Sequence, residues 1–546
     1  MSEVSGGVIL GKALKSLGVE VVFYLIGGPL EEMMWECSRQ GIRLVDVRHE
    51  QAAAMMAHAY SRTTGKVGVC VTGPAPACIN MATGVAVAFD DCAPVVAISG
   101  SATMDSRGKG AFEETNQVEL MRPITKRAWE VLSPERIPDF IGMAFRHATG
   151  NKPGPVYLDL PADVLYGKVD EGRVRLPSLP KDIGRTMGDE KLVKEAMAML
   201  QRSERPIVIA GSGALWADAG PELKEFIEYT QIPVFTTPLA RGLIPDDHSL
   251  CFPYARSFAW KEADTVLLIG SRTNFIIQHL LPPRFSKELK VIMVNIDVEE
   301  IGHNRDADVG IVGDAKAVLR QFVKQMKAGF DSSFAKSWAK QVGQVNSEKG
   351  EQALPQLSTD AKPIHPLRLC KEVRDFLPRD AILAVDGHMI LNFARQSIPT
   401  YFPRHRLNPG PSGCMGVGIP FGIGAKLAKP EKQVLVLTGD GAFGMNGMEM
   451  DTAIRHGIQI IVVVSTNGSW AGMPSKWPSG YKLGLTRYDK VVEALGGAGY
   501  YVEEPDEIRP ALDAALASGK PALVNVITSP VWATTQIFAS YRASAI

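Results

Sequence analysis

Short runs of aliphatic and β-branched residues recur along the whole chain, and stretches with helical periodicity separate them. The runs lie at 21–26, 67–72, 93–99, 154–160, 206–211, 265–270, 290–297, 381–386, 434–440, 459–467 and 522–528. Buried strands that alternate with helices favour parallel sheets joined by right-handed crossovers. We therefore expect an α/β protein built from doubly wound parallel sheets.

Length and composition indicate how many such sheets there are. A chain of 546 residues is longer than one hydrophobic core usually organises. Residues 165–190 are polar and contain Pro and Gly, and residues 328–363 are hydrophilic and end in prolines, which is the composition of linkers. The sequence therefore predicts three α/β domains, at 1–165, 190–325 and 365–546.

Charge and cysteine content limit the classes of partner and compartment. Lys+Arg and Asp+Glu both count 59, so no global field recruits nucleic acid or an anionic membrane. The seven cysteines are scattered without a C-x-x-C pair, which favours reduced thiols. Residues 1–20 lack the regions of a signal peptide, and no apolar run is long enough to span a bilayer. We expect a cytoplasmic protein that binds neither nucleic acid nor membrane.

The motif with the most chemical information is Gly439-Asp440-Gly441, which ends one predicted strand. Asn467 ends the next, 27 positions after Asp440, with room for one helix near 447–456. Both side chains would then lie at the carboxyl ends of strands in one sheet, where α/β folds bind ligands. A carboxylate and an amide oxygen suit Mg²⁺, and the glycines let the backbone approach a diphosphate. The alternative is a simple Gly-Asp-Gly turn.

A GDG motif followed at this distance by an asparagine resembles the signature of thiamine-diphosphate (ThDP) enzymes. The resemblance covers nearly the whole chain and is closest to the acetolactate synthase-like group, although Thr466 stands where that family usually has a first asparagine. It implies a ThDP-binding fold with a Rossmann-like central domain, and Mg²⁺ held by Asp440, Asn467 and the Ser469 carbonyl. It also implies a homodimer or homotetramer, in which the amino-terminal domain of one subunit completes the site on another.

Two further residues resemble contacts to the cofactor in that family. Glu50, in Arg48-His49-Glu50-Gln51, matches the glutamate that hydrogen-bonds N1′ of the aminopyrimidine and so favours removal of the C2 proton. Met415, which follows Gly413, matches the bulky residue that holds the two cofactor rings in a V. The alternatives are an exposed glutamate at a helix start and a core methionine.

Within the group the chain looks most like 2-hydroxyacyl-CoA lyases and oxalyl-CoA decarboxylases. In the loop that faces the cofactor in this family, Phe112 stands where oxalyl-CoA decarboxylases usually carry tyrosine, which leaves an apolar wall. The other candidate catalytic groups are Glu113, Glu114, Gln117, His388 and Glu493. For Glu493, which follows the metal loop, a solvated helix face is the alternative.

The central domain and the tail resemble CoA-binding regions. Arg272, Asp297 and Asp314 follow predicted strands and match the region that holds the ADP part of CoA; FAD or a structural role are the alternatives. The tail 530–546 carries Tyr541, Arg542 and Ser544, and resembles a lid over the thioester, with a frayed terminus as the alternative.

The resemblance thus implies a ThDP- and Mg²⁺-dependent lyase that cleaves the C1–C2 bond of a 2-hydroxyacyl-CoA. Its products would be formyl-CoA and an aldehyde or ketone. The apolar wall at Phe112 favours a short, branched substrate such as the 2-hydroxyisobutyryl thioester. Oxalyl-CoA decarboxylase and an acetolactate synthase-type carboligase that uses 2-oxo acids remain the alternatives.

Overall fold

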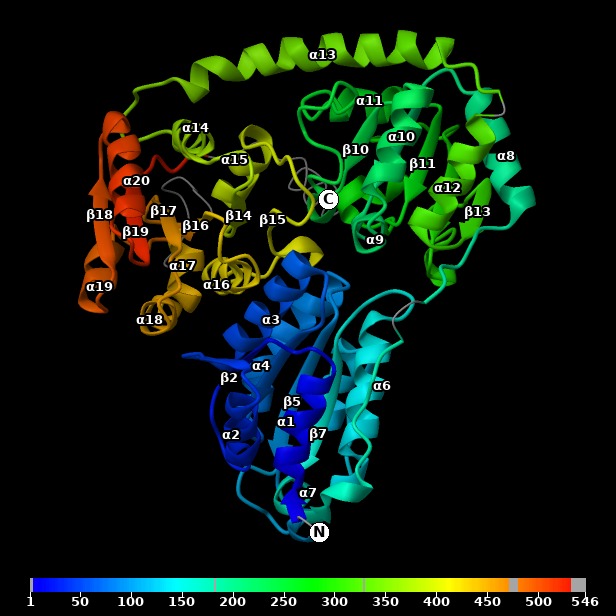
Figure 1. Ribbon diagram of the computed structural model, residues 1–546. Coiled ribbons are helices and arrows are strands. Elements are labelled where there is room, and N and C mark those ends of the chain that lie inside the picture. The colour runs from blue at the N-terminus through cyan, green and yellow to red at the C-terminus, as the bar shows by residue number, and fades with distance from the viewer. Residues whose placement is uncertain (1–2, 181–182, 328, 471–479, 532–546) are drawn as a thin grey trace.

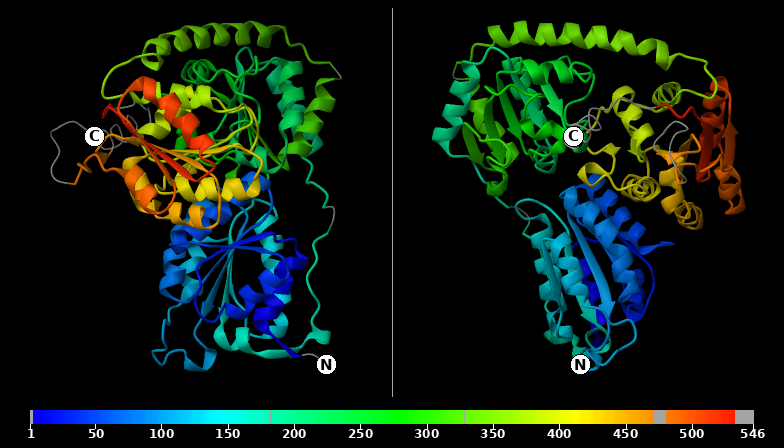
Figure 2. Two further views of the ribbon diagram at one scale, coloured as in Figure 1. Left: turned by 60° about the vertical axis from the view of Figure 1, so that its left-hand side comes forward. Right: turned by 180° about the vertical axis from the view of Figure 1, so that it is seen from behind.

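The chain forms three lobes, each built around one sheet (Figure 1). The computed structural model describes residues 3–180, 183–327, 329–470 and 480–531. In the view of Figure 1 the amino-terminal lobe lies below the other two, and α13 (Ser333–Leu357) runs across the top from the middle lobe towards the carboxy-terminal lobe. The views in Figure 2 show the same arrangement from the side and from behind.

The amino-terminal sheet has six parallel strands in the order β3-β2-β4-β5-β7-β6. These strands are β2 (Val21–Tyr24), β3 (Arg43–Asp46), β4 (Gly68–Thr72), β5 (Val95–Ser101), β6 (Arg127–Glu130) and β7 (Val156–Pro161). The helices are α1 (Gly6–Ser16), α2 (Glu31–Arg39), α3 (Glu50–Thr64), α4 (Pro76–Asp90), α5 (Gln117–Met121), α6 (Ile137–Thr149) and α7 (Ala162–Tyr166). Alternate residues of β5 enter two different cores, one with α3 and α4 and one with α1 and α6, so both faces of the sheet are covered. A short antiparallel pair, β1 (Glu3–Ser5) and β8 (Lys168–Asp170), closes this lobe.

The carboxy-terminal sheet repeats that topology, with the order β15-β14-β16-β17-β19-β18. Its strands are β14 (Ile382–Val385), β15 (Arg406–Leu407), β16 (Val434–Gly439), β17 (Ile461–Thr466), β18 (Ala498–Val502) and β19 (Ala522–Ile527). The helices are α14 (Pro366–Phe376), α15 (Met389–Ser397), α16 (Gly418–Ala428), α17 (Asp440–Asn446), α18 (Glu449–Arg455), α19 (Tyr488–Ala494) and α20 (Ile508–Ala517). In both sheets the strand order reverses between the first and third strands of the lobe, and such a switch point is where α/β folds bind ligands.

The middle lobe has a five-stranded parallel sheet in the order β10-β9-β11-β12-β13. Its elements are α8 (Glu190–Gln201), β9 (Pro206–Ala210), α9 (Ser212–Trp216), α10 (Gly220–Thr230), β10 (Val234–Thr236), α11 (Arg256–Glu262), β11 (Thr265–Ile269), β12 (Lys290–Asn295), β13 (Val309–Val312) and α12 (Ala315–Met326). The expected fold class, three doubly wound parallel sheets, is confirmed. The hydrophilic segment 328–363 differs from a simple linker, because most of it forms α13, which packs Trp338 into the middle lobe and Leu357 into the carboxy-terminal lobe.

The first and third lobes share one continuous apolar core. Buried alanines and methionines of α3 pack against Ile419, Phe421 and Ile423 of α16, and the same core reaches both sheets. A Cβ atom on Gly424 would lie 2.4 Å from the Met56 carbonyl oxygen and 2.9 Å from the Ala59 Cβ atom. The two helices therefore pack too closely at this point to admit any side chain on residue 424. No helix among the described residues is long and apolar enough to cross a membrane.

Replacing Gly424 by alanine should separate α3 from α16 and lower the stability of the protein. Overpacking of this kind costs about 1–3 kcal/mol. The matched control is Gly444→Ala on α17, where a new Cβ atom meets nothing within 4 Å and should be neutral or stabilising by up to about 1 kcal/mol. Thermal unfolding of both variants checks this; equal midpoints would contradict the close packing.

Candidate active site

A crevice opens at the carboxyl ends of β14 and β16, the switch point of the carboxy-terminal sheet. Gly387 and His388 follow β14, and Gly439 and Asp440 end β16 and begin α17. Gly387 has φ +88°, a backbone conformation that favours glycine, and a Cβ atom there would lie 3.1 Å from the Gly439 nitrogen, so the two loops pass close together at this point. The two loops line one cavity of about 40 Å³.

Asp440 is a buried carboxylate bound by backbone amides. Its Oδ1 accepts a hydrogen bond from Gly441 N (2.9 Å), and its Oδ2 accepts from Asn467 N (3.1 Å) and Gly468 N (2.7 Å). Burial raises the pKa of Asp440, although these amide donors oppose that rise. Because none of its hydrogen-bond partners among the described residues is a cationic side chain, a bound metal ion would stabilise the ionised form.

Asn467 and Ser469 line the same cavity as Asp440. The Asn467 Oδ1 atom accepts hydrogen bonds from Ser469 N (2.9 Å) and Ser469 Oγ (3.2 Å), which fixes the turn after β17. Among the described residues there is no cluster of three or more His, Cys, Asp and Glu that could hold a metal ion. A metal at Asp440 would therefore complete its shell with amide, carbonyl and phosphate oxygens, which is the donor set that Mg²⁺ takes with phosphorylated ligands.

Thr466, which replaces the usual asparagine, has a structural role. Its hydroxyl donates to Asn525 Oδ1 (2.5 Å), and the Asn525 amide donates to the Thr486 carbonyl (3.0 Å). This fixes β17 against β19 and the segment before α19. Thr466 is thus bound within the sheet, and the next residue, Asn467, lines the cavity that contains Asp440.

The loop 413–418 is anchored by a buried carboxylate that sequence reasoning missed. Asp386 Oδ2 accepts hydrogen bonds from Gly416 N (3.0 Å) and Gly418 N (2.8 Å), and burial raises its pKa to about 6. These bonds hold Met415 in the cavity that contains Asp440 and His388, and Gly413 lies in the same loop with φ +61°. The one signal in the sequence is an acidic residue at the end of a predicted strand, 381–386.

Trp470 is a second cavity residue that the motif did not reveal. Its indole packs so closely on Gly441 that a Cβ atom there would lie 2.5 Å from Trp470 Cζ3. Gly441 is thus required by an aromatic wall. The sequence offered only an aromatic residue next to Ser469.

Glu50 begins α3 and lies in the amino-terminal lobe, 8% exposed. Its Oε2 accepts a hydrogen bond from Asn80 Nδ2 (3.0 Å), and the adjacent Gln51 donates to Asn446 Oδ1 (2.9 Å). Glu50 is not among the described residues that line the cavity around Asp440. Within one chain, the predicted activating glutamate and the predicted metal ligand therefore do not share a cavity.

Four of the other predicted catalytic residues lie in the loop before α5 or at the first residue of α5, in different environments. Phe112 is 87% exposed, and the neighbouring Glu113 has φ +55°. The Glu114 carboxylate binds the Gly108 and Ala111 amides, and these hydrogen bonds lower its pKa. Gln117 is buried and fully bonded: its Oε1 accepts from Ala75 N, and its Nε2 donates to Gly100 O, Tyr157 Oη and Asp159 Oδ1. Gln117 thus links the start of α5 to β5, β7 and the N-terminus of α4.

The remaining predicted residues either bind other residues of the chain or lie outside the described residues. Glu493 is exposed on α19, where Lys490 donates to it at 2.7 Å. Arg272 donates to the Asp90 carbonyl, Asp297 accepts from Lys152 (3.0 Å), and Asp314 caps α12 and accepts from Arg185 (2.8 Å). The tail residues Tyr541, Arg542 and Ser544 lie outside the described residues.

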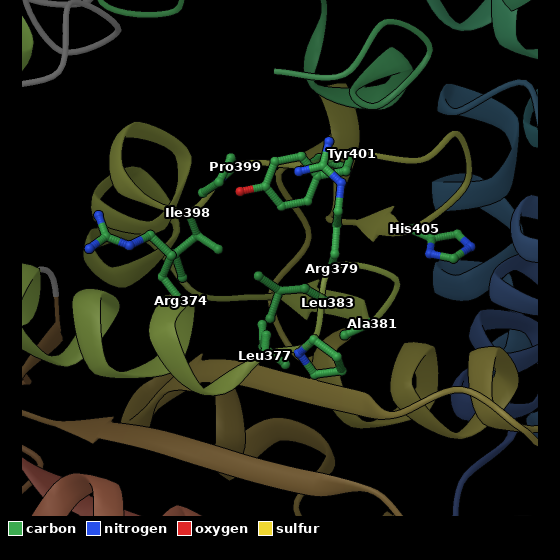
Figure 3. A pocket seen from close by; sticks show the side chains of 11 residues that line it. Arg374, Leu377, Arg379, Ala381, Leu383, Ile398, Pro399, Tyr401 and His405 are labelled. Carbon is green, nitrogen blue, oxygen red and sulfur yellow. The ribbon is translucent and has the colours of Figure 1, made fainter. Parts of the chain in front are cut away.

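A second cavity on the carboxy-terminal lobe is larger, about 170 Å³, and none of the predicted cofactor or metal residues lines it (Figure 3). Its Arg379 lies 3.8 Å from the centre of the Tyr401 ring and forms an ion pair with Asp247 (2.8 Å). Arg374 is paired with Asp375 at 2.8 Å. Because these cations are already neutralised, volume alone does not make this cavity the functional site.

Comparison with known proteins identifies the family. Three models of thiamine pyrophosphate enzymes match the chain: the N-terminal TPP-binding domain at 4–120, the central domain at 193–322 and the C-terminal TPP-binding domain at 387–526. The chain is a ThDP enzyme. The cavity that contains Asp440 lies in the C-terminal TPP-binding domain and Glu50 lies in the N-terminal one.

Several named relatives are about equally similar to this ThDP enzyme. A 2-hydroxyacyl-CoA lyase of Arabidopsis thaliana is 33% identical over 559 residues, covering 96% of both chains. Oxalyl-CoA decarboxylase of Escherichia coli (strain K12) is 33% identical, covering 96% of this chain and 95% of its own. The acetolactate synthase large subunit of Mycobacterium tuberculosis is 33% identical, covering 96% of both chains. This similarity establishes the group and does not separate its reactions.

Replacing Asp440 by alanine should abolish retention of ThDP, because the diphosphate charge would lose the carboxylate that holds its metal ion. The check is the ThDP and magnesium content of the purified variant after gel filtration. The control is Asp380→Ala, which breaks an exposed pair with Lys432 in the same lobe. Normal ThDP and Mg²⁺ content in the Asp440 variant would contradict the assignment.

Proposed function

We propose that this ThDP enzyme is a 2-hydroxyacyl-CoA lyase that cleaves the C1–C2 bond of a short 2-hydroxyacyl-CoA into formyl-CoA and an aldehyde or ketone. The observation that carries the CoA part is a group of guanidinium side chains between the middle and carboxy-terminal lobes. Its central members are Arg256, the first residue of α11, and Arg395, in the last turn of α15. Neither has a carboxylate partner among the described residues.

The electrostatics of this pair favour a polyanionic ligand. Burial and the positive charges of Arg395, Arg284 and Arg241 lower the pKa of Arg256 to about 9. Burial and Arg241 lower the pKa of Arg395 to about 10. Asp246 pairs with Arg241 and forms no ion pair with Arg256 or Arg395 among the described residues. A phosphate-bearing ligand would neutralise the pair and be held by charge-assisted hydrogen bonds.

The position of the pair suits a substrate that is phosphorylated at one end and reactive at the other. Met389 at the start of α15 lines the cavity that contains Asp440. Arg395 follows six residues later, about 9 Å along the helix axis. A CoA thioester could therefore place its phosphates at Arg395 and Arg256 and extend its acyl end towards the cavity. The 2-oxo acid substrates of an acetolactate synthase-type carboligase are small and carry no phosphate group for these arginines to bind.

The residues of the site have distinct tasks in this proposal. Bound ThDP supplies a carbon nucleophile for the substrate carbonyl and an electron sink for the cleaved bond. Asp440, Asn467 and the Ser469 carbonyl would hold Mg²⁺ and with it the diphosphate, and Met415 would supply an apolar contact to the cofactor. Glu50 would hold the proton at N1′ of the aminopyrimidine. Phe112 contributes an apolar wall that favours a hydrocarbon substituent on C2 of the substrate.

The proposal requires at least a homodimer. ThDP enzymes act as oligomers with active sites at their interfaces, and in this chain Glu50 and the cavity around Asp440 are separate. Exposed apolar side chains adjoin Asn80, Asn446 and Glu449, which bind Glu50, Gln51 and the amides before Glu50: Ile79 (47%), Met445 (46%) and Met448 (51%). Exposed apolar side chains of this kind are what a subunit interface covers. Glu50 of one subunit would then serve the Asp440 cavity of the other, in a homodimer or homotetramer.

The experiment incubates the protein with ThDP, Mg²⁺ and a panel of 2-hydroxyacyl-CoAs, oxalyl-CoA and pyruvate, and follows the products by mass. Formyl-CoA and acetone from the 2-hydroxyisobutyryl thioester are expected. Faster turnover of oxalyl-CoA than of every 2-hydroxyacyl-CoA would overturn the assignment as a lyase. Formation of acetolactate from pyruvate would overturn it as well.

Arg395→Ala and Arg256→Ala should each raise KM for the CoA substrate by about 10- to 100-fold, since a charge-assisted hydrogen bond contributes about 1.5–3 kcal/mol. ThDP content should stay at the wild-type level. Arg320→Ala, which removes an exposed guanidinium from the middle lobe, is the control. An unchanged KM in both the Arg395→Ala and the Arg256→Ala variant would contradict phosphate binding at this pair.

A further inference from the structure

A buried carboxylate links the carboxy-terminal lobe to the segment that carries Glu50. Glu449, the first residue of α18, is 1% exposed. Its Oε1 accepts hydrogen bonds from Arg48 N (3.1 Å) and His49 N (3.1 Å), and its Oε2 accepts from Arg48 N (3.3 Å) and Thr452 Oγ1 (2.7 Å). None of these partners is a cationic side chain.

The two amides that Glu449 binds directly precede Glu50. His49 is the N-cap residue of α3, and its own Nδ1 accepts from Gln51 N (3.3 Å). Amides at a helix start lack partners within the helix, and a side chain usually binds them from the same segment. Here the acceptor comes from another lobe, some 400 positions away in the sequence. The start of α3 is thus fixed relative to the carboxy-terminal lobe.

We propose that Glu449 is a positioning residue for Glu50. By binding the Arg48 and His49 amides it fixes the backbone from which the Glu50 carboxyl extends, while Asn80 orients that carboxyl through Oε2. The assignment rests on the proposed role of Glu50 at the cofactor. It extends that role to a residue that contacts neither cofactor nor substrate.

The burial of Glu449 is difficult to explain by stability alone. Desolvation raises its pKa to about 7, even though Thr452, Arg48 and His49 donate to it. A neutral, well-packed residue of similar volume would avoid that desolvation. The Glu449 side chain is long enough for its carboxylate to accept hydrogen bonds from two successive amides across the lobe interface. These two bonds hold the backbone from which the Glu50 side chain extends.

Two conservative variants separate reach from charge. Glu449→Gln keeps the arm and an amide oxygen that can accept from both N–H groups, whereas Glu449→Asp keeps the charge and loses one methylene of reach. A positioning role predicts that the Gln variant exchanges C2–H of bound ThDP within a few-fold of wild type. The Asp variant should be slower by up to about 100-fold, because a displacement of about 1 Å at a reacting group has effects of that size.

The measurement is C2–H to C2–D exchange in the holoenzyme by quenched NMR, together with ThDP content and melting temperature. Glu36→Ala is the control for stability, since Glu36 is a buried carboxylate that bonds within α2 and to its end. It should lower the melting temperature and leave exchange unchanged. Wild-type exchange in Glu449→Asp, or a Gln variant as slow as the Asp variant, would overturn the positioning role.

A double variant distinguishes failure of this inference from failure of the proposed function. Glu50→Gln alone should slow exchange by about 10²–10⁴-fold. If Glu449 acts through Glu50, then Glu50→Gln with Glu449→Asp should be no slower than Glu50→Gln alone. Multiplied effects would reject positioning and leave the role of Glu50 intact. Wild-type exchange in Glu50→Gln would instead reject the proposed role of Glu50, and the positioning inference with it.

Discussion

The close packing of α3 against α16 is the contact on which the rest of the site depends. It merges the cores of the first and third lobes and leaves room for no side chain on Gly424. The buried Arg62 adds to it, donating to Asp91 Oδ2 (3.1 Å) and to the Asn408 carbonyl (3.1 Å). Because α3 starts at Glu50, this packing also sets where the carboxyl that we propose as the activating group lies in each subunit.

Three buried carboxylates then hold the loops that carry the residues proposed to bind the cofactor. Asp386 binds the amides of the Met415 loop, Asp440 binds those after β17, and Glu449 binds those before α3. In the part of the chain that the structure describes, none of the three has a cationic hydrogen-bond partner, and burial raises the pKa of each. Such carboxylates are costly unless amides or a metal ion compensate them. They fix loop geometry before ligands bind, which is the preorganisation that catalysis requires.

Much of the fold could be predicted from the sequence, because buried parallel strands are continuous apolar runs and GDG marks a strand end. The predicted helix near 447–456 is α18, but α17 begins at Asp440 itself. Short edge strands such as β6 and β15 escaped, since few residues carry their pattern. Arg395 and Glu449 escaped for another reason: their environments come from segments far apart in the chain, and no local spacing signals them.

We propose that each active site combines the Asp440 cavity of one subunit with Glu50 of another. Mixing the Asp440→Ala and Glu50→Gln variants after dissociation and reassembly tests it most directly. If sites are shared, each hybrid dimer regains one intact site, and about a quarter of wild-type activity should return at equal mixing with random pairing. If each chain builds its own site, every site keeps one defect, and a mixture as inactive as its components would contradict the account.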